Sequence, residues 1–259
     1  MGRRQPESAT GHLDGPYSSL NKLETKLMKY RGILFDKDGT LLDFNKTWLP
    51  IYRVAAQEFS GGDADLANQL LENFGFDAAR DRFLGGSLLA AGNNDEIAQA
   101  WSALTGQAEQ VDRFSERLNE IFHVEGAKQA TAVDKLGATL QVLKQSGLKL
   151  GVATADSYQG IINTLQSFDV LEAFDFLAGY DSGHGRKPEA GMVVAFCEQM
   201  QLEVETVVIV GDNRHDIEMG RNAKVGLCVG VLTGTSTRED LETIADIVLD
   251  DISGLPDVI

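Results

Sequence analysis

The stretch ILFDKDGTLL, residues 33–42, decides the fold of this chain. A short apolar run ends on two carboxylates, Asp36 and Asp38, and Gly-Thr follows at once. Short apolar runs bounded by turn residues are typical of buried parallel strands. Alternation along an extended chain points both acids to one side, at the end of the strand where open parallel sheets bind ligands. Because two close acids repel each other unless a cation or a proton intervenes, the stretch predicts a metal site. In that site one carboxylate would ligate and attack while its neighbour handles protons.

The same stretch could also belong to a calcium-binding loop or to a solvated turn. A calcium-binding loop requires glycine at its sixth position and glutamate at its twelfth, whereas Gly39 is only the fourth residue counted from Asp36. A solvated turn would be the better interpretation if the motif stood alone. Polar residues later in the chain argue against it.

The composition limits the classes of protein to which the chain can belong. Its 259 residues suffice for one large domain or two small ones, and 43% of them are hydrophobic. A formal net charge of −16 disfavours nucleic acid and anionic membranes as partners. No apolar run approaches the roughly 20 residues that a membrane span needs. Cys197 and Cys228 lack Cys or His neighbours at zinc-ligand spacing, so we expect two buried, reduced thiols and a cytoplasmic protein.

Three kinds of segment follow one another along the chain. Residues 1–30 are predicted to form a partly disordered extension with a short helix at 20–30. Residues 45–128 show helical periodicity and no convincing strand, which predicts an all-helical cap of four or five helices. From about residue 131 strands and helices alternate, and this indicates a parallel sheet with helices on both faces. Because the first strand belongs to that sheet, residues 31–44 and 129–259 are expected to form one doubly wound, Rossmann-like α/β core that the cap interrupts.

Four further polar residues fall where predicted strands stop or helices begin. Thr154 follows an apolar strand, and alone it would be interpreted as a cap of the next turn. Lys187 lies in a Gly-rich loop, where a lysine is normally a solvated charge. Asp212 and Asp216 follow the most apolar strand of the chain. Together with the two acids of the first strand they would concentrate four carboxylates in one crevice. Such charge is tolerable chiefly around a divalent cation, and oxygen-only ligands favour Mg²⁺.

The motifs in this order resemble those of the haloacid dehalogenase superfamily, and the cap resembles the helical insert of that superfamily. Each motif is weak singly, but the four in order at strand ends are specific, and the resemblance covers the chain from about residue 31 onward. The branch most similar to this chain is that of the phosphoglycolate-phosphatase-like phosphatases. The four motifs are Asp36-x-Asp38-Gly39-Thr40, Thr154, Lys187-Pro188 and Gly211-Asp212-x-x-x-Asp216.

The resemblance implies a role for each acidic residue. Asp36 would be the nucleophile that forms an aspartyl-phosphate. Asp38 would protonate the leaving alcohol and then deprotonate the hydrolytic water. Mg²⁺ would be held by Asp36, Asp212 and the backbone carbonyl of Asp38. Asp216 would orient the metal shell or the lysine of the third motif.

The resemblance also implies a phosphate-binding set, which comprises Thr154, Lys187, Gly39 and Thr40. Phosphoryl transfer depends on positioning and on positive charge at the equatorial oxygens, and this explains a lysine among acids. The implied activity is the Mg²⁺-dependent hydrolysis of a small phosphate monoester similar to phosphoglycolate. The expected partner is therefore a small phosphorylated metabolite. The sequence leaves the oligomeric state open, a homodimer included.

Other activities of the superfamily, and a module without activity, are alternatives to ester hydrolysis. Dehalogenase members of the superfamily lack an acid at the position of Asp38, so carbon–halogen cleavage is disfavoured. A phosphomutase of the β-phosphoglucomutase type would keep all four motifs. A non-catalytic module that binds a phosphate ligand would usually lose the nucleophile or a metal ligand. Arg80 and Arg82 of the cap could meet a substrate carboxylate, although an arginine on a solvated face is the commoner case.

Overall fold

One parallel sheet forms the centre of the larger part of the molecule. The computed structural model describes residues 29–259, so most of the predicted extension and its helix lie outside the described residues. Within this range the sheet contains six strands in the order β5-β4-β1-β6-β7-β8, all of them parallel. These strands are β1 (Gly32–Phe35), β4 (Lys149–Ala153), β5 (Phe176–Ala178), β6 (Val207–Gly211), β7 (Leu227–Val231) and β8 (Ile247–Leu249).

The strand order confirms the predicted doubly wound α/β fold. Renumbered along the chain, the six strands follow the Rossmann order 3-2-1-4-5-6. The order reverses between β1 and β6, and such folds bind ligands outside the carboxyl ends of the strands at that point. The sheet therefore marks the end of β1 as the place for a site.

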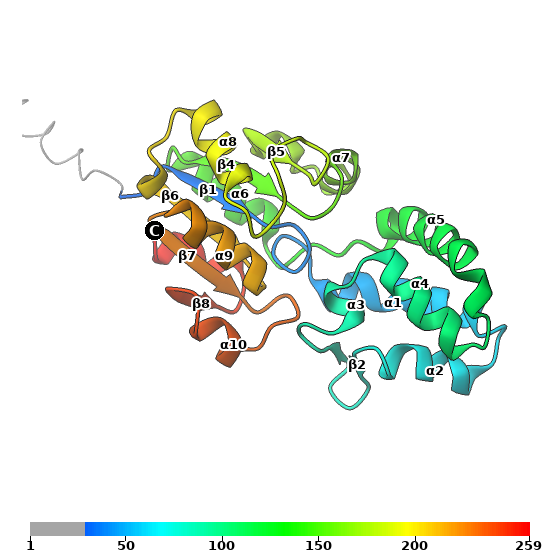
Figure 1. Ribbon diagram of the computed structural model, residues 1–259. Coiled ribbons are helices and arrows are strands. Elements are labelled where there is room, and N and C mark those ends of the chain that lie inside the picture. Colours follow the sequence, from blue (N-terminus) through cyan, green and yellow to red (C-terminus); the bar gives the residue numbers. More distant parts are fainter. Residues whose placement is uncertain (1–28) are drawn as a thin grey trace, which may run out of the picture.

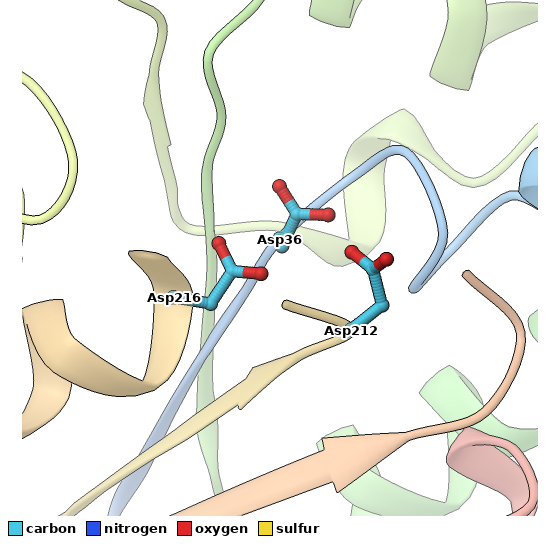
Figure 2. A group of neighbouring side chains, drawn as sticks. All are labelled: Asp36, Asp212 and Asp216. Carbon is cyan, nitrogen blue, oxygen red and sulfur yellow. The ribbon is translucent and has the colours of Figure 1, made fainter. Parts of the chain in front are cut away.

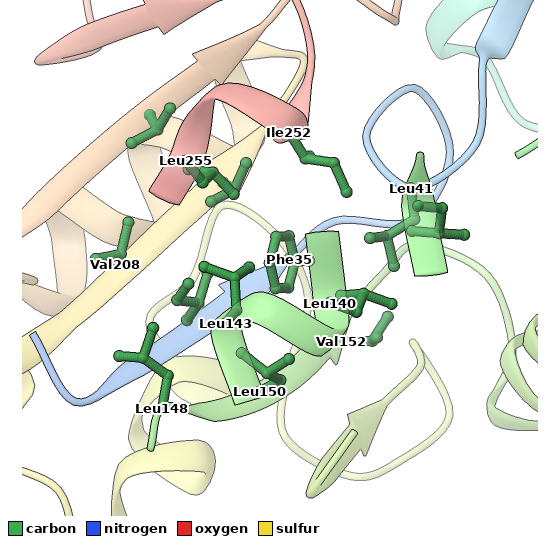
Figure 3. Close-up of a cluster of buried hydrophobic side chains, with 14 of the residues drawn as sticks. Phe35, Leu41, Leu140, Leu143, Leu148, Leu150, Val152, Val208, Ile252 and Leu255 are labelled. Atoms are coloured by element: carbon green, nitrogen blue, oxygen red, sulfur yellow. The ribbon is translucent and has the colours of Figure 1, made fainter. Parts of the chain in front are cut away.

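Helices cover both faces of the sheet because its side chains alternate between them (Figure 1). Phe35 packs into one hydrophobic cluster, with α6, α7 and η4, and Leu34 packs into another, with α8 and α9. Both side chains are fully buried, and each such burial contributes about 1.5–3 kcal/mol. Figure 3 shows Phe35 among the apolar side chains of α6 and η4. The helices around the sheet are α6 (Leu136–Gln145), α7 (Tyr158–Ser167), η2 (Leu171–Ala173), α8 (Gly191–Met200), η3 (Val204–Thr206), α9 (Arg214–Ala223), α10 (Arg238–Glu242) and η4 (Ile252–Asp257).

The insert between β1 and β4 has a hydrophobic cluster of its own, around Tyr52 and Trp101. A capping box opens α4, because the Asn93 side chain accepts the Glu96 N–H at 3.0 Å and the backbone N–H of Asn93 donates to the Glu96 side chain at 2.9 Å. The helices of the insert are α1 (Phe44–Phe59), α2 (Ala64–Glu72), α3 (Leu88–Ala91), α4 (Asn94–Leu104), η1 (Ala108–Gln110) and α5 (Val111–Gln129). We keep residues 45–128 as the proposed cap and residues 31–44 and 129–259 as the proposed core.

The insert also contains a strand pair that the prediction of an all-helical cap did not include. β2 (Phe76–Asp77) pairs antiparallel with β3 (Arg82–Phe83). Strands of two residues are too short to show an alternating pattern in the sequence. The turn between them is built by the Asp77 side chain, which accepts the N–H groups of Ala79 and Arg80 at 3.0 and 3.2 Å. The cap is therefore helical except for this hairpin.

Two further predictions from the sequence concern membrane-spanning segments and the state of the cysteines. No helix among residues 29–259 is both long and apolar enough to cross a bilayer. Cys197 and Cys228 are buried and unpaired, as predicted. Burial raises the pKa of the Cys228 thiol to about 11, so this side chain stays a neutral, apolar group.

Candidate active site

Two neighbouring strands place the first and fourth motifs beside each other. Phe35 pairs with Val210 across β1 and β6, and the N–H of Asp36 donates to the Val210 carbonyl at 2.8 Å. Asp36 and Asp212 therefore leave the sheet at the same end, where the strand order reverses. Together with Asp216 they form a buried group in which one carboxylate oxygen of each lies within 4.8 Å of the others. Figure 2 shows the three carboxylates turned toward a common space.

Lys187 supplies a positive charge to this acidic group. Its ammonium nitrogen lies 2.6 Å from Asp36 Oδ1 and 2.5 Å from Asp216 Oδ1, and its side chain is only 7% exposed. Asp216 is itself held in the first turn of α9, because its Oδ2 accepts the N–H of Asn213 at 3.2 Å. Burial opposes the charge on Lys187, but Asp216 and Asp36 outweigh it and raise the pKa of the lysine. The lysine is therefore a fixed cation aimed at the predicted nucleophile.

One lysine does not balance three buried acids. Burial, with the charges of Asp216 and Asp38 in support, raises the pKa of Asp36 to about 7 although Lys187 opposes this. Burial and the charges of Asp216 and Asp36 likewise raise the pKa of Asp212 well above its ordinary value. Without a further cation Asp36 and Asp212 thus tend to hold protons. A divalent cation would reverse that tendency.

The donor atoms fit a hard cation. Asp36 Oδ2 is buried and has no hydrogen-bond partner among the described residues, so it is free to ligate. Asp212 is oriented by the Thr235 N–H, which donates to its Oδ2 at 3.0 Å. The available donors are carboxylate oxygens, and Mg²⁺ prefers such ligands. The side chain of Asp38 lies outside this group, and ligation by its backbone carbonyl stays a prediction.

Two glycines allow the backbone to approach Asp212 closely. Gly39 has φ +92°, a left-handed conformation, and a Cβ at that position would lie 2.6 Å from Asp212 Cγ. A Cβ at Gly234 would lie 1.8 Å from Asp212 Oδ2. The turn after β1 and the loop after β7 thus enclose this carboxylate. Any side chain at either glycine would displace it.

The predicted phosphate-binding groups differ in whether their hydrogen-bond donors are already used within the protein. Thr154 is 1% exposed, and its Oγ1 accepts the Asp156 N–H at 3.1 Å, which leaves its own proton to donate. Gly39 N–H donates to the Leu42 carbonyl at 2.8 Å, and Thr40 N–H donates to the Lys37 carbonyl at 3.3 Å. These two backbone donors are engaged in the turn after β1. Their phosphate-binding role stays a prediction.

Comparisons with known proteins assign this chain to a family. Residues 33–229 match the family model described as "Haloacid dehalogenase-like hydrolase". The chain belongs to the haloacid dehalogenase-like hydrolases. This hydrolase is 25% identical over 228 residues to the pyrophosphatase PpaX of Listeria welshimeri, covering 88% of this chain and 95% of the relative. It is 26% identical over 238 residues to a phosphoglycolate phosphatase of Psychrobacter arcticus, covering 87% and 94%.

A solved structure shows the same fold as this hydrolase. It is a predicted phosphoglycolate phosphatase from Haemophilus somnus, with a TM-score of 0.71 and 18% identity. The match covers 90% of this chain and 99% of that one. The likeness extends over the sheet and the insert together.

The hydrolase contains site residues that the sequence analysis did not single out. Lys37 is 3% exposed, and its ammonium lies 2.8 Å from Asp38 Oδ2 and 3.1 Å from Asp156 Oδ2. Burial opposes its charge, but Asp38 and Asp156 outweigh it and raise the pKa of Lys37. The signal for this residue was a lysine at the buried end of an apolar strand, between two acids. Thr235, which orients Asp212, gave no comparable signal.

The two cap arginines weighed as substrate contacts are engaged elsewhere in the structure. Arg80 pairs with Asp77 at 2.9 Å within its own hairpin, where its side chain is 73% exposed. Arg82 donates from Nη2 to the Thr235 carbonyl at 3.0 Å, so it links β3 to the loop that orients Asp212. Arg82 thus connects the cap to the site through the backbone of the core.

The raised carboxyl pKa predicts how stability depends on pH and magnesium. Asp36 has a folded pKa of about 7, above its ordinary value of 3.8, so the protonated form stabilises the fold. This contribution is complete below the ordinary value and is lost as the pH rises through about 7. With EDTA we expect the melting temperature of the hydrolase to fall between about pH 5 and about pH 8. Mg²⁺ should raise it more at the upper pH than at the lower. Differential scanning fluorimetry measures both, and an equal effect of Mg²⁺ at the two pH values would contradict the assignment.

Proposed function

We propose that this hydrolase is a Mg²⁺-dependent phosphatase that cleaves a small, phosphoglycolate-like phosphate monoester through an aspartyl-phosphate. The observation that carries the proposal is the contact of Lys187 with Asp36, beside Asp212 and Asp216. A carboxylate placed against a fixed cation, with a free oxygen, suits in-line attack on a phosphoryl group. The phosphatases among the relatives support the same class of reaction.

The metal would be held by Asp36 and Asp212 together with the backbone carbonyl of Asp38. When bound, Mg²⁺ supplies positive charge to the phosphoryl oxygens and offsets the repulsion among the acids. Asp216 would keep Lys187 in place, because it accepts a hydrogen bond from the ammonium and is itself fixed by Asn213.

In the first step a carboxylate oxygen of Asp36 attacks phosphorus. A new P–O bond forms to Asp36 as the bond from phosphorus to the ester oxygen breaks. Asp38 gives its proton to the departing oxygen, so the product leaves as a neutral alcohol. Lys187 and the hydroxyl of Thr154 donate to the equatorial phosphoryl oxygens, where charge is concentrated.

In the second step water hydrolyses the aspartyl-phosphate. The water oxygen attacks phosphorus, the bond from phosphorus to Asp36 breaks, and the carboxylate of Asp36 is restored with release of phosphate. Asp38 accepts the proton of the water and so regains the proton that it gave to the alcohol. The two steps together consume one water and one ester.

Two other activities are kept as alternatives to the phosphatase. A phosphomutase of the β-phosphoglucomutase type would pass the phosphoryl group to a second substrate hydroxyl in place of water. A non-catalytic module would bind a phosphate ligand without turnover. We further propose a cytoplasmic location on the basis of the two unpaired, buried cysteines, and a homodimer remains one option for assembly.

Phosphate release from a panel of small esters tests this function. The panel should contain p-nitrophenyl phosphate, 2-phosphoglycolate, glucose phosphates, nucleoside monophosphates and pyrophosphate, each with Mg²⁺ and with EDTA. We expect Mg²⁺-dependent release of phosphate, fastest with a small carboxylate-bearing ester. Conversion of one glucose phosphate to another without net release would favour the mutase. Absence of turnover with every ester would favour the binding module.

A further inference from the structure

Asp38, the predicted acid–base residue, has a single charged partner among the described residues. Among residues 29–259 the only cation within ion-pair distance of the Asp38 carboxylate is the ammonium of Lys37, at 2.8 Å. Asp38 also lies outside the group formed by Asp36, Asp212 and Asp216. Its side chain is 21% exposed, whereas that of Lys37 is 4% exposed. Among the described residues, Lys37 is thus the charged side chain that can orient this carboxylate.

Lys37 is itself held from two directions. Its carbonyl accepts the N–H groups of Leu41 and Leu42 at 2.9 and 3.0 Å, so the backbone of the turn after β1 is fixed. Its side chain is 4% exposed and ends 3.1 Å from Asp156 Oδ2. A lysine buried to this extent requires paired carboxylates, because an unpaired buried charge is strongly disfavoured. The ammonium is thus a fixed point between two acids.

The second acid belongs to the turn that carries Thr154. Asp156 donates its N–H to Thr154 Oγ1 at 3.1 Å and accepts the Ser157 N–H at 2.6 Å on Oδ1. Lys37 therefore connects Asp38 at the end of β1 with the predicted phosphate-binding turn at the end of β4. On the β6 side Lys187 similarly joins Asp36 to Asp216, and neither of these acids is Asp38.

We propose that Lys37 is a positioning residue that, held by Asp156, fixes the Asp38 carboxylate for hydrolysis of the aspartyl-phosphate. The inference rests on the proposed phosphatase function and extends it. In the hydrolytic step Asp38 has to point at the attacking water, and its contact with the buried ammonium of Lys37 at 2.8 Å fixes the direction of the carboxylate. Lys37 does not touch the substrate, and its effect passes through Asp38.

The test separates the two chemical steps with p-nitrophenyl phosphate. Its leaving group departs without protonation, so kcat/KM reports formation of the aspartyl-phosphate and kcat reports its hydrolysis when that step limits turnover. In Lys37→Met we expect kcat to fall about tenfold or more, since misplacing a catalytic group has effects of this size. We expect kcat/KM to change by less than about threefold, so KM falls with kcat. Rapid mixing should show a burst of p-nitrophenolate approaching one per active site.

Two further variants and a control accompany this measurement. Lys37→Arg should restore most of kcat, because a guanidinium can contact both carboxylates. Asp156→Asn keeps the acceptor for Ser157 but removes the charge that holds Lys37, so it should show a smaller fall in kcat with kcat/KM preserved. It also serves as the test if Lys37→Met does not fold. Lys144→Met removes a lysine that pairs with Asp175 at 2.8 Å, and it should leave both constants unchanged.

The possible outcomes distinguish this inference from the function on which it rests. If the unaltered protein hydrolyses no ester, the proposed function fails. If it is active and Lys37→Met lowers kcat and kcat/KM equally, Lys37 has only a structural role and the inference is overturned. An unchanged kcat in folded Lys37→Met overturns it as well.

Discussion

Asp36→Asn is expected to abolish ester hydrolysis while leaving the fold intact. The amide matches the carboxylate in size but cannot form the covalent bond to phosphorus. Removing a nucleophile from an enzyme that works by covalent catalysis costs on the order of 10⁶ in kcat in well-studied cases. We expect a loss of at least about 10³-fold here, measured as Mg²⁺-dependent phosphate release from p-nitrophenyl phosphate.

The matched control for this variant is Asp63→Asn. Asp63 caps α2 in the insert, where its side chain accepts the N–H groups of Asp65 and Leu66 at 3.0 Å. Asparagine caps helices about as well as aspartate, so this variant should keep its activity and its melting temperature. Substantial turnover by purified Asp36→Asn would remove Asp36 from its role as nucleophile.

Lys187→Met is expected to impair both activity and stability. The ammonium contacts Asp36 and Asp216 and is the cation that would meet the phosphoryl oxygens. Loss of one such donor typically lowers kcat by about 10²–10³-fold. Removing one partner from a buried ion pair costs about 3–5 kcal/mol, because the remaining charges are left uncompensated. We therefore expect a lower melting temperature in EDTA and a partial recovery in Mg²⁺.

Lys128→Met provides the comparison for this variant. Lys128 is 61% exposed and pairs with Glu125 at 2.9 Å on the surface of α5. Exposed pairs of this kind contribute little, so neither activity nor melting temperature should change measurably. If Lys187→Met kept the kcat/KM of the unaltered protein, the lysine would have no part in phosphoryl transfer.

The sheet and the residues at its edge were predictable because they depend on local pattern. The apolar run before Asp36 and the one before Asp212 predict buried strands. The carboxyl ends of neighbouring parallel strands lie at the same edge of the sheet. The contact between Lys187 and Asp36 joins residues 151 positions apart. The resemblance of the motifs to those of the superfamily implied that both lie at the site, and only the folded structure could give the distance between them.

The features that escaped prediction depend on tertiary contacts or on short segments. The β2–β3 hairpin rests on a turn built by the Asp77 side chain, which leaves no periodic signal. The pairing of Lys37 with Asp156 requires the register of β1 against β4, which the sequence did not specify. Thr235 reaches Asp212 from a loop 23 positions further along the chain. Backbone donors of this kind can come from any residue except proline, so composition gives no sign of them.

The two chain segments that connect the sheet to the insert are hydrogen-bonded to each other. The N–H of Asp43 donates to the Thr131 carbonyl at 2.9 Å, and the N–H of Thr131 donates to Thr47 Oγ1 at 3.0 Å. Because the two ends of the insert are held together, lengthening the insert costs little additional conformational entropy. The entropy cost of closing a loop rises only with the logarithm of its length. Natural selection can therefore enlarge, shorten or exchange everything between these ends at small expense to the sheet. The insert can thus diverge separately from the sheet that carries the acidic residues.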